Sequence, residues 1–442
     1  MTTIPQLYSI YLQHSVICTD TRTISNGCLF FALKGEKFDA NQFAHQAIEN
    51  GAAFAIIDNP EYKLNNQYLL VPDVLTALQH LARFHREKLN IPVIGLTGSN
   101  GKTTTKELIY AVLSQHFNTL ATQGNLNNHI GVPLTILSIN SNHQIAVIEM
   151  GANHQKEIAF LSEISMPTHG LITNVGKAHL EGFGGVEGVK KGKGELYDFL
   201  SKDPERIVFV NSNSADLMKM QADRDLKNTI FYGLNQSGNL VNGKLIENSP
   251  FLSVEWVNVP TGKTHQVKTQ LTGAYNLDNI LAAISIGITF GLSDNMINKG
   301  IEGYSPKNNR SQIIHTKTHT VICDYYNANP SSMQVAIENI AKLEADQKVL
   351  ILGDMFEMGE EAANEHQFII NKALQTKANL IIFIGNEFYK AGYQLTSEIK
   401  KTHFFKDTED AIEYLKVNPI NNATILIKGS RGMALERLIG FV

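Results

Sequence analysis

A glycine-rich turn between an apolar run and a helix-like segment constrains the fold more than any other part of the sequence. Residues 93–107 read VIGLTGSNGKTTTKE, so an apolar run meets Gly98 and Gly101 and continues into Lys102 and three threonines. A strand, a glycine turn, a Lys-Thr pair and a helix in this order bind phosphate groups, because glycine lets backbone N–H groups face an anion. The stretch therefore predicts a phosphate-binding loop at the end of a strand.

The loop is a short variant of the pattern found in nucleoside-triphosphate sites. The strict pattern requires a glycine five positions before Gly101, where this chain has Leu96. We still expect Lys102 to reach the outer phosphates and Thr103 to place its hydroxyl on Mg²⁺. The alternative is a plain glycine turn with a solvated lysine, and the order of the elements argues against it. The predicted nucleotide-binding residues of the loop are Gly98, Ser99, Asn100, Gly101, Lys102, Thr103 and Thr104.

The composition is that of a globular protein with several domains. The chain has 442 residues, of which 43% are hydrophobic and 18% charged, and these values predict two to four domains with substantial cores. The formal net charge of −4 provides no basic surface for a nucleic-acid backbone. We therefore expect no nucleic-acid partner.

The sequence also predicts a cytoplasmic location. The first fifteen residues lack the basic start and the long apolar stretch of a secretion signal. The longest uncharged apolar run, Ile280 to Leu292, has thirteen residues, which is too short to span a bilayer and fits a buried helix. Cys18, Cys28 and Cys323 have no metal-like spacing, so we expect buried thiols in a reducing compartment. We predict a monomer that does not insert into a membrane.

Apolar runs divide the chain into three predicted α/β domains. Residues 1–88 contain short strand-like runs and one helix-like stretch from Val74 to Leu89, which predict a small domain. Residues 89–308 alternate strands and helices, which indicates a parallel sheet. Within them, residues 228–271 read as strand-rich and predict an antiparallel edge or flap. After a polar linker, Ser305 to Ser311, residues 309–442 alternate again and predict a Rossmann-like doubly wound domain that ends in a helix.

Polar side chains follow two of the predicted central strands. Glu149 closes the run QIAVIE, where a parallel sheet presents ligands, and a carboxylate there suits Mg²⁺ bound to phosphates. The alternative is a glutamate that caps the next turn. His179 follows the strand LITNV among glycines, and imidazole is a less common Mg²⁺ ligand than oxygen. On chemistry alone, His179 is a loop histidine.

Two further central segments carry weaker signals. Lys190, Lys191 and Lys193 form a basic cluster, which by composition alone reads as a solvated helix start. The segment GNLNNHIGVP holds three amides that could equally bind a sugar or peptide or form turns. These amides are Asn125, Asn127 and Asn128.

The later segments place further polar residues at strand ends or on one helix face. Asn276 and Asn279 are three residues apart and share a helix face. Asp324 ends a predicted strand, a position that suits ribose hydroxyls. Cations and amides near such ends can bind an anion or a peptide. The candidates there are Asn327, Asn329, Lys428, Ser430 and Arg431.

Taken together, these stretches resemble the Mur ligases, the ATP-dependent amide-forming enzymes of bacterial cell-wall synthesis. TDTRTISNGCLFFALKGEKFDANQF is similar to their uridine-nucleotide-binding domain and GLTGSNGKTTTKE to their phosphate loop. The stretches EMGANHQKEI, NVGKAHLEGFG, KGELY, YNLDNILAA, DYYNANPSSM, LGDMFEMGEEAANEH and IKGSRGM follow in family order. The resemblance spans nearly the whole chain.

The resemblance implies the substrates and the reaction. YNANPSSM and EMGANHQKEI are most similar to members that join D-alanyl-D-alanine to UDP-N-acetylmuramoyl-tripeptide, whereas members that add the third residue usually have a histidine within the former motif. ATP would phosphorylate the tripeptide carboxylate, and the dipeptide amine would then attack the acyl phosphate. The cofactors implied are ATP and two Mg²⁺ ions.

The resemblance also implies roles for single residues. Glu149 and His179 would hold Mg²⁺, and Lys193 would be carbamylated and meet the second metal. The residues implied near nucleotide or phosphate are Asn279, Arg310, Asp324 and Lys428. Those implied near the uridine end are Thr19, Asp20 and Lys34, and those near the dipeptide or acyl group are Asn327, Asn329, Ser430 and Arg431. Lys177 departs from the family, because many members have proline there.

The sequence is also compatible with two other functions. The chain could be another ligase of the same type or a folate or cyanophycin relative. It could also be a nucleotide switch that hydrolyses ATP to move domains and makes no bond, in which case phosphate release would not depend on an amine.

Overall fold

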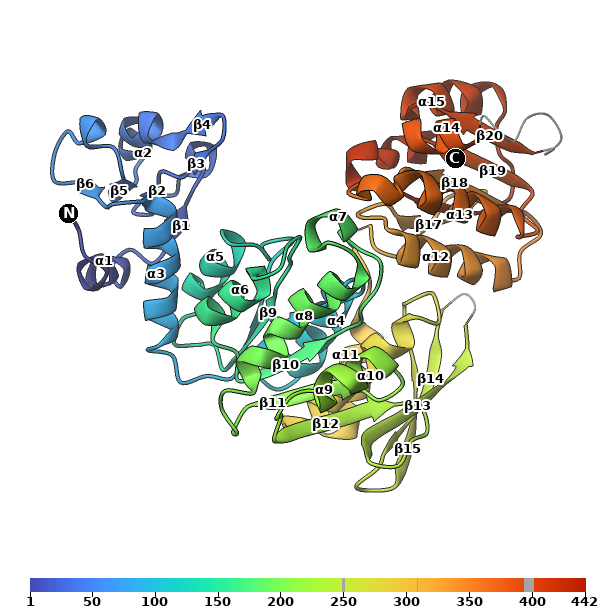
Figure 1. Cartoon of the computed structure of the whole chain (residues 1–442), viewed down its shortest axis with the longest axis horizontal. Helices are drawn as coiled ribbons and strands as arrows, with labels where there is room; N and C mark the ends of the chain where they lie inside the picture. Colours follow the sequence, from blue (N-terminus) through green and yellow to red (C-terminus); the bar gives the residue numbers. More distant parts are fainter. Residues whose placement is uncertain (249–250, 308, 393–400) are drawn as a thin grey trace.

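The computed structural model describes residues 1–248, 251–307, 309–392 and 401–442. Three α/β units follow one another along the chain, and the central unit lies between the two outer ones (Figure 1). The predicted fold class is confirmed: a small N-terminal unit, a central unit with the phosphate loop on a mainly parallel sheet, and a doubly wound C-terminal unit. The domain limits themselves, 1–88, 89–308 and 309–442, stay a prediction.

The N-terminal unit is built on a parallel sheet with the strand order β1-β2-β5-β6. Successive residues of a strand point to opposite faces, so Phe30 packs into one core cluster while Leu29 and Phe31 pack into another. The elements are α1 (Ile4–Tyr11), β1 (Ile17–Cys18), β2 (Leu29–Phe31), β3 (Lys34–Gly35), β4 (Phe38–Asp39), α2 (Ala44–Glu49), β5 (Phe54–Ile57) and β6 (Tyr68–Leu70).

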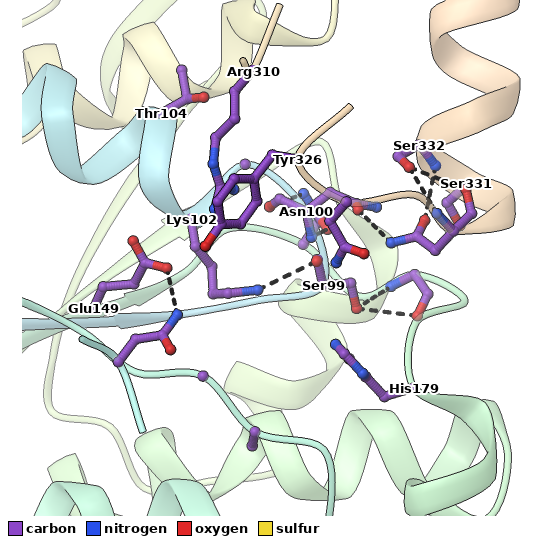
Figure 2. Close-up of a pocket in the computed structure, with 18 of the residues that line it drawn as sticks. Ser99, Asn100, Lys102, Thr104, Glu149, His179, Arg310, Tyr326, Ser331 and Ser332 are labelled. Carbon is purple, nitrogen blue, oxygen red and sulfur yellow. Dashed lines mark hydrogen bonds between the residues drawn. The ribbon is translucent and has the colours of Figure 1, made fainter. Parts of the chain in front are cut away.

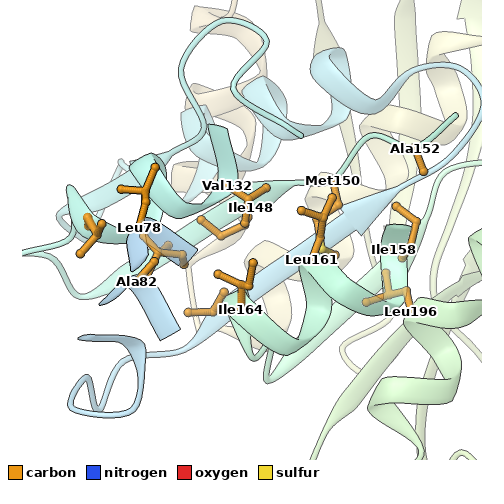
Figure 3. Close-up of a cluster of buried hydrophobic side chains, with 14 of the residues drawn as sticks. Leu78, Ala82, Val132, Ile148, Met150, Ala152, Ile158, Leu161, Ile164 and Leu196 are labelled. Atoms are coloured by element: carbon orange, nitrogen blue, oxygen red, sulfur yellow. The ribbon is translucent and has the colours of Figure 1, made fainter. Parts of the chain in front are cut away.

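Helix α3 (Val74–Arg86) joins the N-terminal and central units. The helix begins after Asp73, whose side chain accepts a hydrogen bond from the Thr76 N–H at 2.7 Å, and it ends at Arg86 rather than at the predicted Leu89. Its buried face packs against α5 (Gly131–Leu137) and α6 (Glu157–Ser165), and Figure 3 shows Leu78 and Ala82 in this cluster. One continuous core therefore connects the two units.

The central unit is built on a nine-stranded sheet with the order β15-β14-β13-β12-β11-β10-β7-β9-β8. Helices α4, α10 and α11 cover one face, and α5, α6 and α8 cover the other. The remaining elements are β7 (Val93–Thr97), α4 (Lys102–Leu113), β8 (Thr119–Ala121), β9 (Ile145–Glu149), β10 (His169–Ile172), α7 (Leu180–Phe183), α8 (Val186–Leu200), β11 (Ile207–Asn211), α9 (Ala215–Ala222), β12 (Asn228–Gly233), β13 (Asn239–Glu247), β14 (Ser253–Asn258), β15 (Lys263–Lys268), α10 (Asn276–Thr289) and α11 (Asp294–Gly303).

The strand-rich segment over residues 228–271 differs in part from the prediction. Strand β12 pairs in parallel with β11 and β13, so antiparallel pairing begins only between β13 and β14. Strand β13 was not predicted from the sequence, because its residues NLVNGKLIE contain Asn and Gly within a short apolar pattern. Gly243 makes room for α10 there, since a Cβ atom at this position would lie 2.4 Å from Leu281 Cδ2.

The apolar run from Ile280 to Leu292 forms most of α10, which is buried as predicted. Across the described ranges of the chain, no helix combines the length and the apolar character needed to cross a bilayer. The three cysteines are buried, as expected, and none of them is in a disulfide.

The C-terminal unit has the strand order β16-β17-β21-β18-β19-β20, in which only β16 is antiparallel to its neighbour. Helices α12, α13 and α14 pack on one face and α15 on the other, so the sheet is doubly wound. The elements are β16 (Gln312–His315), β17 (Thr320–Asp324), α12 (Pro330–Lys342), β18 (Lys348–Gly353), α13 (Ala362–Leu374), β19 (Leu380–Ile384), α14 (Asn386–Gly392), β20 (Thr402–Phe405), α15 (Thr408–Val417) and β21 (Thr424–Lys428).

The prediction of an α-helix at the end of the chain is wrong. Residues Arg431–Met433 and Leu435–Phe441 form two 3₁₀ segments. Ala434 between them has φ of 53°, a left-handed conformation that interrupts a helix. Two other predictions fall partly outside the described residues, namely the linker at Asn308 and the helix before β20 at residues 393–400.

Candidate functional site

The phosphate loop connects β7 to α4 and is fastened to the end of the neighbouring strand β10. Gly98 and Gly101 have φ of 148° and 77°, and a Cβ atom on Gly98 would lie 2.0 Å from the hydroxyl of Thr173. The Thr173 hydroxyl and the Asn174 side-chain amide both donate to the Asn100 carbonyl, at 2.6 and 3.0 Å. Glycine is therefore required at Gly98 by space as well as by backbone conformation.

The first turn of α4 presents groups that suit an anion. Helix geometry leaves the N–H groups of Lys102, Thr103 and Thr104 without an intrahelical acceptor. Lys102 folds back over the loop, and its Nζ donates to the Gly98 carbonyl at 2.7 Å. Burial lowers the pKa of Lys102 to about 8. A phosphate at this position would meet both the free N–H groups and the lysine.

Glu149 lies at the end of β9 beside the first turn of α4. Its Oε1 accepts hydrogen bonds from Thr103 Oγ1 at 3.2 Å and from Asn127 Nδ2 at 2.8 Å. Its Oε2 is buried and has no hydrogen-bond partner among the described residues. The donor set of carboxylate, hydroxyl and amide oxygens is one that Mg²⁺ prefers. Neither contact caps the turn that follows Glu149, which was the alternative prediction for this residue.

His179 lines the cavity and contacts the C-terminal unit. Its φ is 53°, and its Nδ1 pairs with the Glu357 carboxylate of that unit. Burial lowers the pKa of His179.

Lys193 does not line the cavity but lies behind it on α8. The residue is only 1% exposed, so the alternative of a solvated helix start is wrong for Lys193, although it fits the exposed Lys191. Its Nζ lies 3.4 Å from the Ala152 carbonyl and 5.0 Å from the centre of the Phe183 ring. Burial lowers the pKa of Lys193 well below its usual value, which favours the neutral amine.

The C-terminal unit contributes a second set of polar groups. Asp324 at the end of β17 accepts a hydrogen bond from Lys428 Nζ at 2.6 Å and one from the Ser311 N–H at 3.2 Å. The guanidinium of Arg310 stacks on the ring of Tyr326 at 3.9 Å, and Figure 2 shows the two side by side. The Nε of Arg310 is buried and has no partner among the described residues. This N–H group is therefore available to a bound anion.

The two units also meet directly at the phosphate loop. Asn329 Nδ2 donates to Asn100 Oδ1 at 2.8 Å, and Lys177 of the loop after β10 contacts both Ser331 and Glu365. Asn279 of α10 contacts the first part of α4, since its Oδ1 accepts from Thr105 Oγ1 at 2.9 Å. Residues far apart in the sequence thus form one site.

A cavity of about 800 Å³ lies between the central and C-terminal units (Figure 2). Most of the predicted site residues line it. Those residues are Ser99, Asn100, Gly101, Lys102, Thr104, Asn125, Asn127, Asn128, Glu149, His179, Asn279, Arg310, Asp324, Asn327, Asn329 and Lys428.

Some predicted residues lie outside this lining. Gly98 and Thr103 lie at the two ends of the phosphate loop. Ser430 is buried within the C-terminal unit, where its Oγ accepts a hydrogen bond from the Phe356 N–H at 3.0 Å. Arg431 is exposed, and its guanidinium lies 5.2 Å from the Tyr326 ring centre, on the same unit.

The three residues predicted at the uridine end lie in the N-terminal unit, and none of them lines the cavity. Asp20 is paired with Arg22 at 2.6 Å, and this hydrogen-bonded guanidinium lowers the pKa of Asp20 to about 2. Lys34 is paired with Asp58 at 2.7 Å, and this hydrogen bond raises the pKa of Lys34. Thr19 precedes Asp20 directly.

The three amides of the segment GNLNNHIGVP, which were predicted either to bind a sugar or peptide or to form turns, differ in their contacts. Asn128 is a turn former, because its Oδ1 accepts from the N–H groups of Ile130 and Gly131 at 3.1 and 2.9 Å. Asn127 instead orients Glu149, and Asn125 is exposed at the cavity.

Asn174, Tyr326 and Glu357 are among the residues of the site that were not predicted from the sequence. Asn174 lies two residues after the end of β10, so its position near a strand end was a usable signal. Tyr326 and Glu357 had no signal of their own, because their contacts with Arg310 and His179 depend on the packing of distant segments.

Comparison with known families gives matches along most of the chain. The Mur ligase family, catalytic domain model matches residues 14–86, the Mur ligase middle domain model matches residues 96–287, and the Mur ligase, glutamate ligase domain model matches residues 309–431. The chain is 34% identical over 429 residues to the UDP-N-acetylmuramoyl-tripeptide–D-alanyl-D-alanine ligase of Bacillus subtilis, covering 96% of this chain and 92% of the relative. It is 34% identical over 426 residues to the enzyme of that name from Escherichia coli, with 96% and 92% covered.

Solved structures show the same architecture. A crystal structure of MurF from Acinetobacter baumannii has a TM-score of 0.85 and 32% identity, covering 96% of this chain and 92% of the other. The MurF ligase of Thermotoga maritima, solved in complex with ADP, has a TM-score of 0.83 and 26% identity, covering 96% of each chain.

Proposed function

Because the chain belongs to the Mur ligase family, we propose that it is an ATP-dependent amide ligase that joins D-alanyl-D-alanine to UDP-N-acetylmuramoyl-tripeptide. The products would be the UDP-muramoyl-pentapeptide, ADP and phosphate, in the synthesis of peptidoglycan precursors. The observation that carries the proposal is that the phosphate loop and the strand-end residues of the C-terminal unit line one and the same cavity. Such a cavity lets an activated acid and an incoming amine meet away from bulk water.

The reaction would proceed in two steps. The terminal carboxylate of the tripeptide attacks the γ-phosphate of ATP and forms an acyl phosphate and ADP. The amine of D-alanyl-D-alanine then attacks the acyl carbon, and phosphate leaves. Lys102, the N–H groups at the start of α4 and Arg310 would hold the phosphates, since phosphoryl transfer depends on positioning and charge neutralisation.

The residues at the loop fit a magnesium ion. Glu149 Oε2 is a buried carboxylate oxygen without a partner in the described part of the chain, and Thr103 lies against the same carboxylate. We propose that Thr103, Glu149 and His179 hold Mg²⁺ and that Lys193, as a carbamate, contacts a second ion. Bound Mg²⁺ would neutralise charge on the phosphates. No group of three His, Cys, Asp or Glu side chains in the described residues could hold a metal alone, so the phosphates would supply further oxygens.

Each unit would bind one substrate. Residues 1–88 would bind the UDP-sugar with Thr19, Asp20 and Lys34, and residues 89–308 would bind ATP. Residues 309–442 would bind the dipeptide. The proposed dipeptide and acyl contacts are Asn327, Asn329, Ser430 and Arg431. On the central unit, Asn125, Asn127 and Asn128 would contact a sugar or peptide part of the substrates. The residues proposed near the nucleotide are Asn279, Asp324 and Lys428. We also propose a cytoplasmic monomer.

One assay tests the proposal. The protein is incubated with ATP, Mg²⁺, UDP-tripeptide and D-alanyl-D-alanine, and the pentapeptide is detected by mass. We expect product only when all four are present. A product with a single amino acid and a tripeptide-free precursor would point to another ligase of the family. Phosphate release that is independent of any amine, with no new peptide, would point to a nucleotide switch and contradict the proposal.

A further inference from the structure

The loop after β10 reaches across to the C-terminal unit through Lys177. The backbone N–H of Lys177 donates to Ser331 Oγ at 3.0 Å, at the start of α12. Its Nζ donates to Glu365 Oε1 at 2.6 Å, on α13. One residue of the central unit therefore contacts two helices of the C-terminal unit.

The two charged groups of this contact differ in their exposure. The side chain of Glu365 is 8% exposed, whereas that of Lys177 is 51% exposed. A carboxylate that is nearly buried needs a cation or hydrogen bonds to remain charged. Loss of Lys177 would leave this carboxylate without its ion-pair partner. Arrangements in which the C-terminal unit moves away and water reaches Glu365 would then gain in population.

The same contact adjoins the phosphate loop. Gly176, the residue before Lys177, donates its N–H to Ser99 Oγ at 2.9 Å, and the Ser99 hydroxyl donates to the Gly176 carbonyl at 3.1 Å. Ser331 lines the cavity and approaches Gly176 so closely that a Cβ atom there would lie 3.0 Å from its Oγ. The position of the C-terminal unit is thus linked to the loop through adjacent residues.

We propose that Lys177 and Glu365 form a clasp that holds the C-terminal unit over the phosphate loop and keeps water from the acyl phosphate. The inference rests on the proposed ligase function. Lys177 acts as a positioning residue, since it contacts Glu365 and Ser331. When the clasp opens, water attacks the acyl carbon, phosphate leaves with release of a proton, and the tripeptide carboxylate returns. The ADP released when the acyl phosphate formed is then not matched by an amide.

Charge substitutions test the clasp in the full-length protein. For Lys177→Ala we expect a KM for D-alanyl-D-alanine about fivefold higher and less than one pentapeptide per ADP. Lys177→Arg should stay close to the wild type. Lys177→Glu should be worse than Lys177→Ala, and the double variant Lys177→Glu/Glu365→Lys should recover part of the loss. Lys372→Ala removes an ion pair with Glu338 inside the C-terminal unit, on the same helix as Glu365, and should behave as wild type. An unchanged KM and full coupling in Lys177→Ala, or no recovery in the double variant, would overturn the clasp.

A distance measurement separates failure of the clasp from failure of the proposed function. Spin labels at Lys202→Cys and Lys377→Cys, which are exposed on the central and C-terminal units, report the separation of the units without any substrate. We expect Lys177→Ala to broaden the distance distribution towards longer values and the charge-swapped pair to narrow it again. Identical distributions in the labelled protein with and without Lys177→Ala would overturn the clasp, even if the protein proved to catalyse another reaction.

Discussion

Thr103 Oγ1 donates a hydrogen bond of 3.2 Å to Glu149 Oε1, and this bond joins the first turn of α4 to the end of β9. The second oxygen of Glu149 is buried without a partner in the described structure. A buried carboxylate oxygen of this kind lowers stability unless a ligand meets it. Stability and ligand binding are therefore opposed at this residue.

Glu149→Gln should separate the two effects. The amide keeps an oxygen for Thr103 and Asn127 but removes the buried charge, so we expect the free energy of unfolding without Mg²⁺ to rise by about 1 kcal/mol. Added magnesium nucleotide should stabilise the wild type and should not stabilise the variant. Thermal unfolding with and without magnesium nucleotide measures both. A variant that is less stable than the wild type yet fully stabilised by magnesium nucleotide would contradict the metal role.

Gly98→Ala should damage the phosphate loop. Its φ of 148° disfavours a side chain, and the added Cβ would lie 2.0 Å from the hydroxyl of Thr173. We expect a loss of about 2 kcal/mol or more in the free energy of unfolding, together with weaker nucleotide binding. Chemical denaturation and calorimetric titration with an ATP analogue measure the two effects. Gly303→Ala is the matched control, because nothing lies within 4 Å of a Cβ there, and it should change neither value.

The parts of the site that follow from one local segment could be predicted from the sequence. The loop from Gly98 to Thr103 is specified by its own glycines and by the helix that follows, and Glu149 is specified by its place at a strand end. Parallel strands bring such ends to one edge of a sheet, so their proximity follows from the alternation of strands and helices.

The contacts between units could not be predicted in this way. The pairs Asn100–Asn329 and His179–Glu357 join segments more than a hundred residues apart, and no local pattern specifies which side chains meet. Lys193 shows a related limit, since a lysine-rich helix reads as solvated while tertiary packing buries this one lysine. Strand β13 was missed because its Asn and Gly, which weaken a strand pattern, are tolerated by the close packing of α10.

Lys193→Ala should lower pentapeptide formation, and short carboxylates should restore part of it. Burial lowers the pKa of Lys193, and the resulting neutral amine is the form that reacts with CO₂ to give a carbamate. An added carboxylate can occupy the space of the missing side chain and supply equivalent oxygens. Activity assays with and without added acetate measure the rescue, and intact-protein mass spectrometry under CO₂ detects the carbamate. Absence of both rescue and carbamate would remove Lys193 from the proposed metal site.

Lys102→Ala should lower turnover by ~10³-fold or more, because the lysine stabilises charge that moves between phosphates in the transition state. The fold should survive, since Lys102 is half-buried at a helix start and its hydrogen bonds go to carbonyls of the same loop. Turnover is measured as pentapeptide formed per second at saturating substrates, with circular dichroism as a check on folding. Near-normal turnover in a folded variant would contradict the phosphate role.

Nucleotide binding should depend on pH through Lys102. Burial lowers its pKa to about 8, so the amine of the free protein is largely neutral above this pH. Phosphates favour the ammonium form and raise the pKa in the complex, so binding takes up a proton and the Kd rises as the pH increases through 8. Calorimetric titrations of an ATP analogue at pH 7 to 9, in buffers of different ionisation enthalpy, measure both the Kd and the proton uptake. In Lys102→Arg the guanidinium stays charged over this pH range, so the proton uptake on nucleotide binding should vanish in this variant. Equal uptake in the wild type and in Lys102→Arg would assign the proton to another group and leave Lys102 without this role.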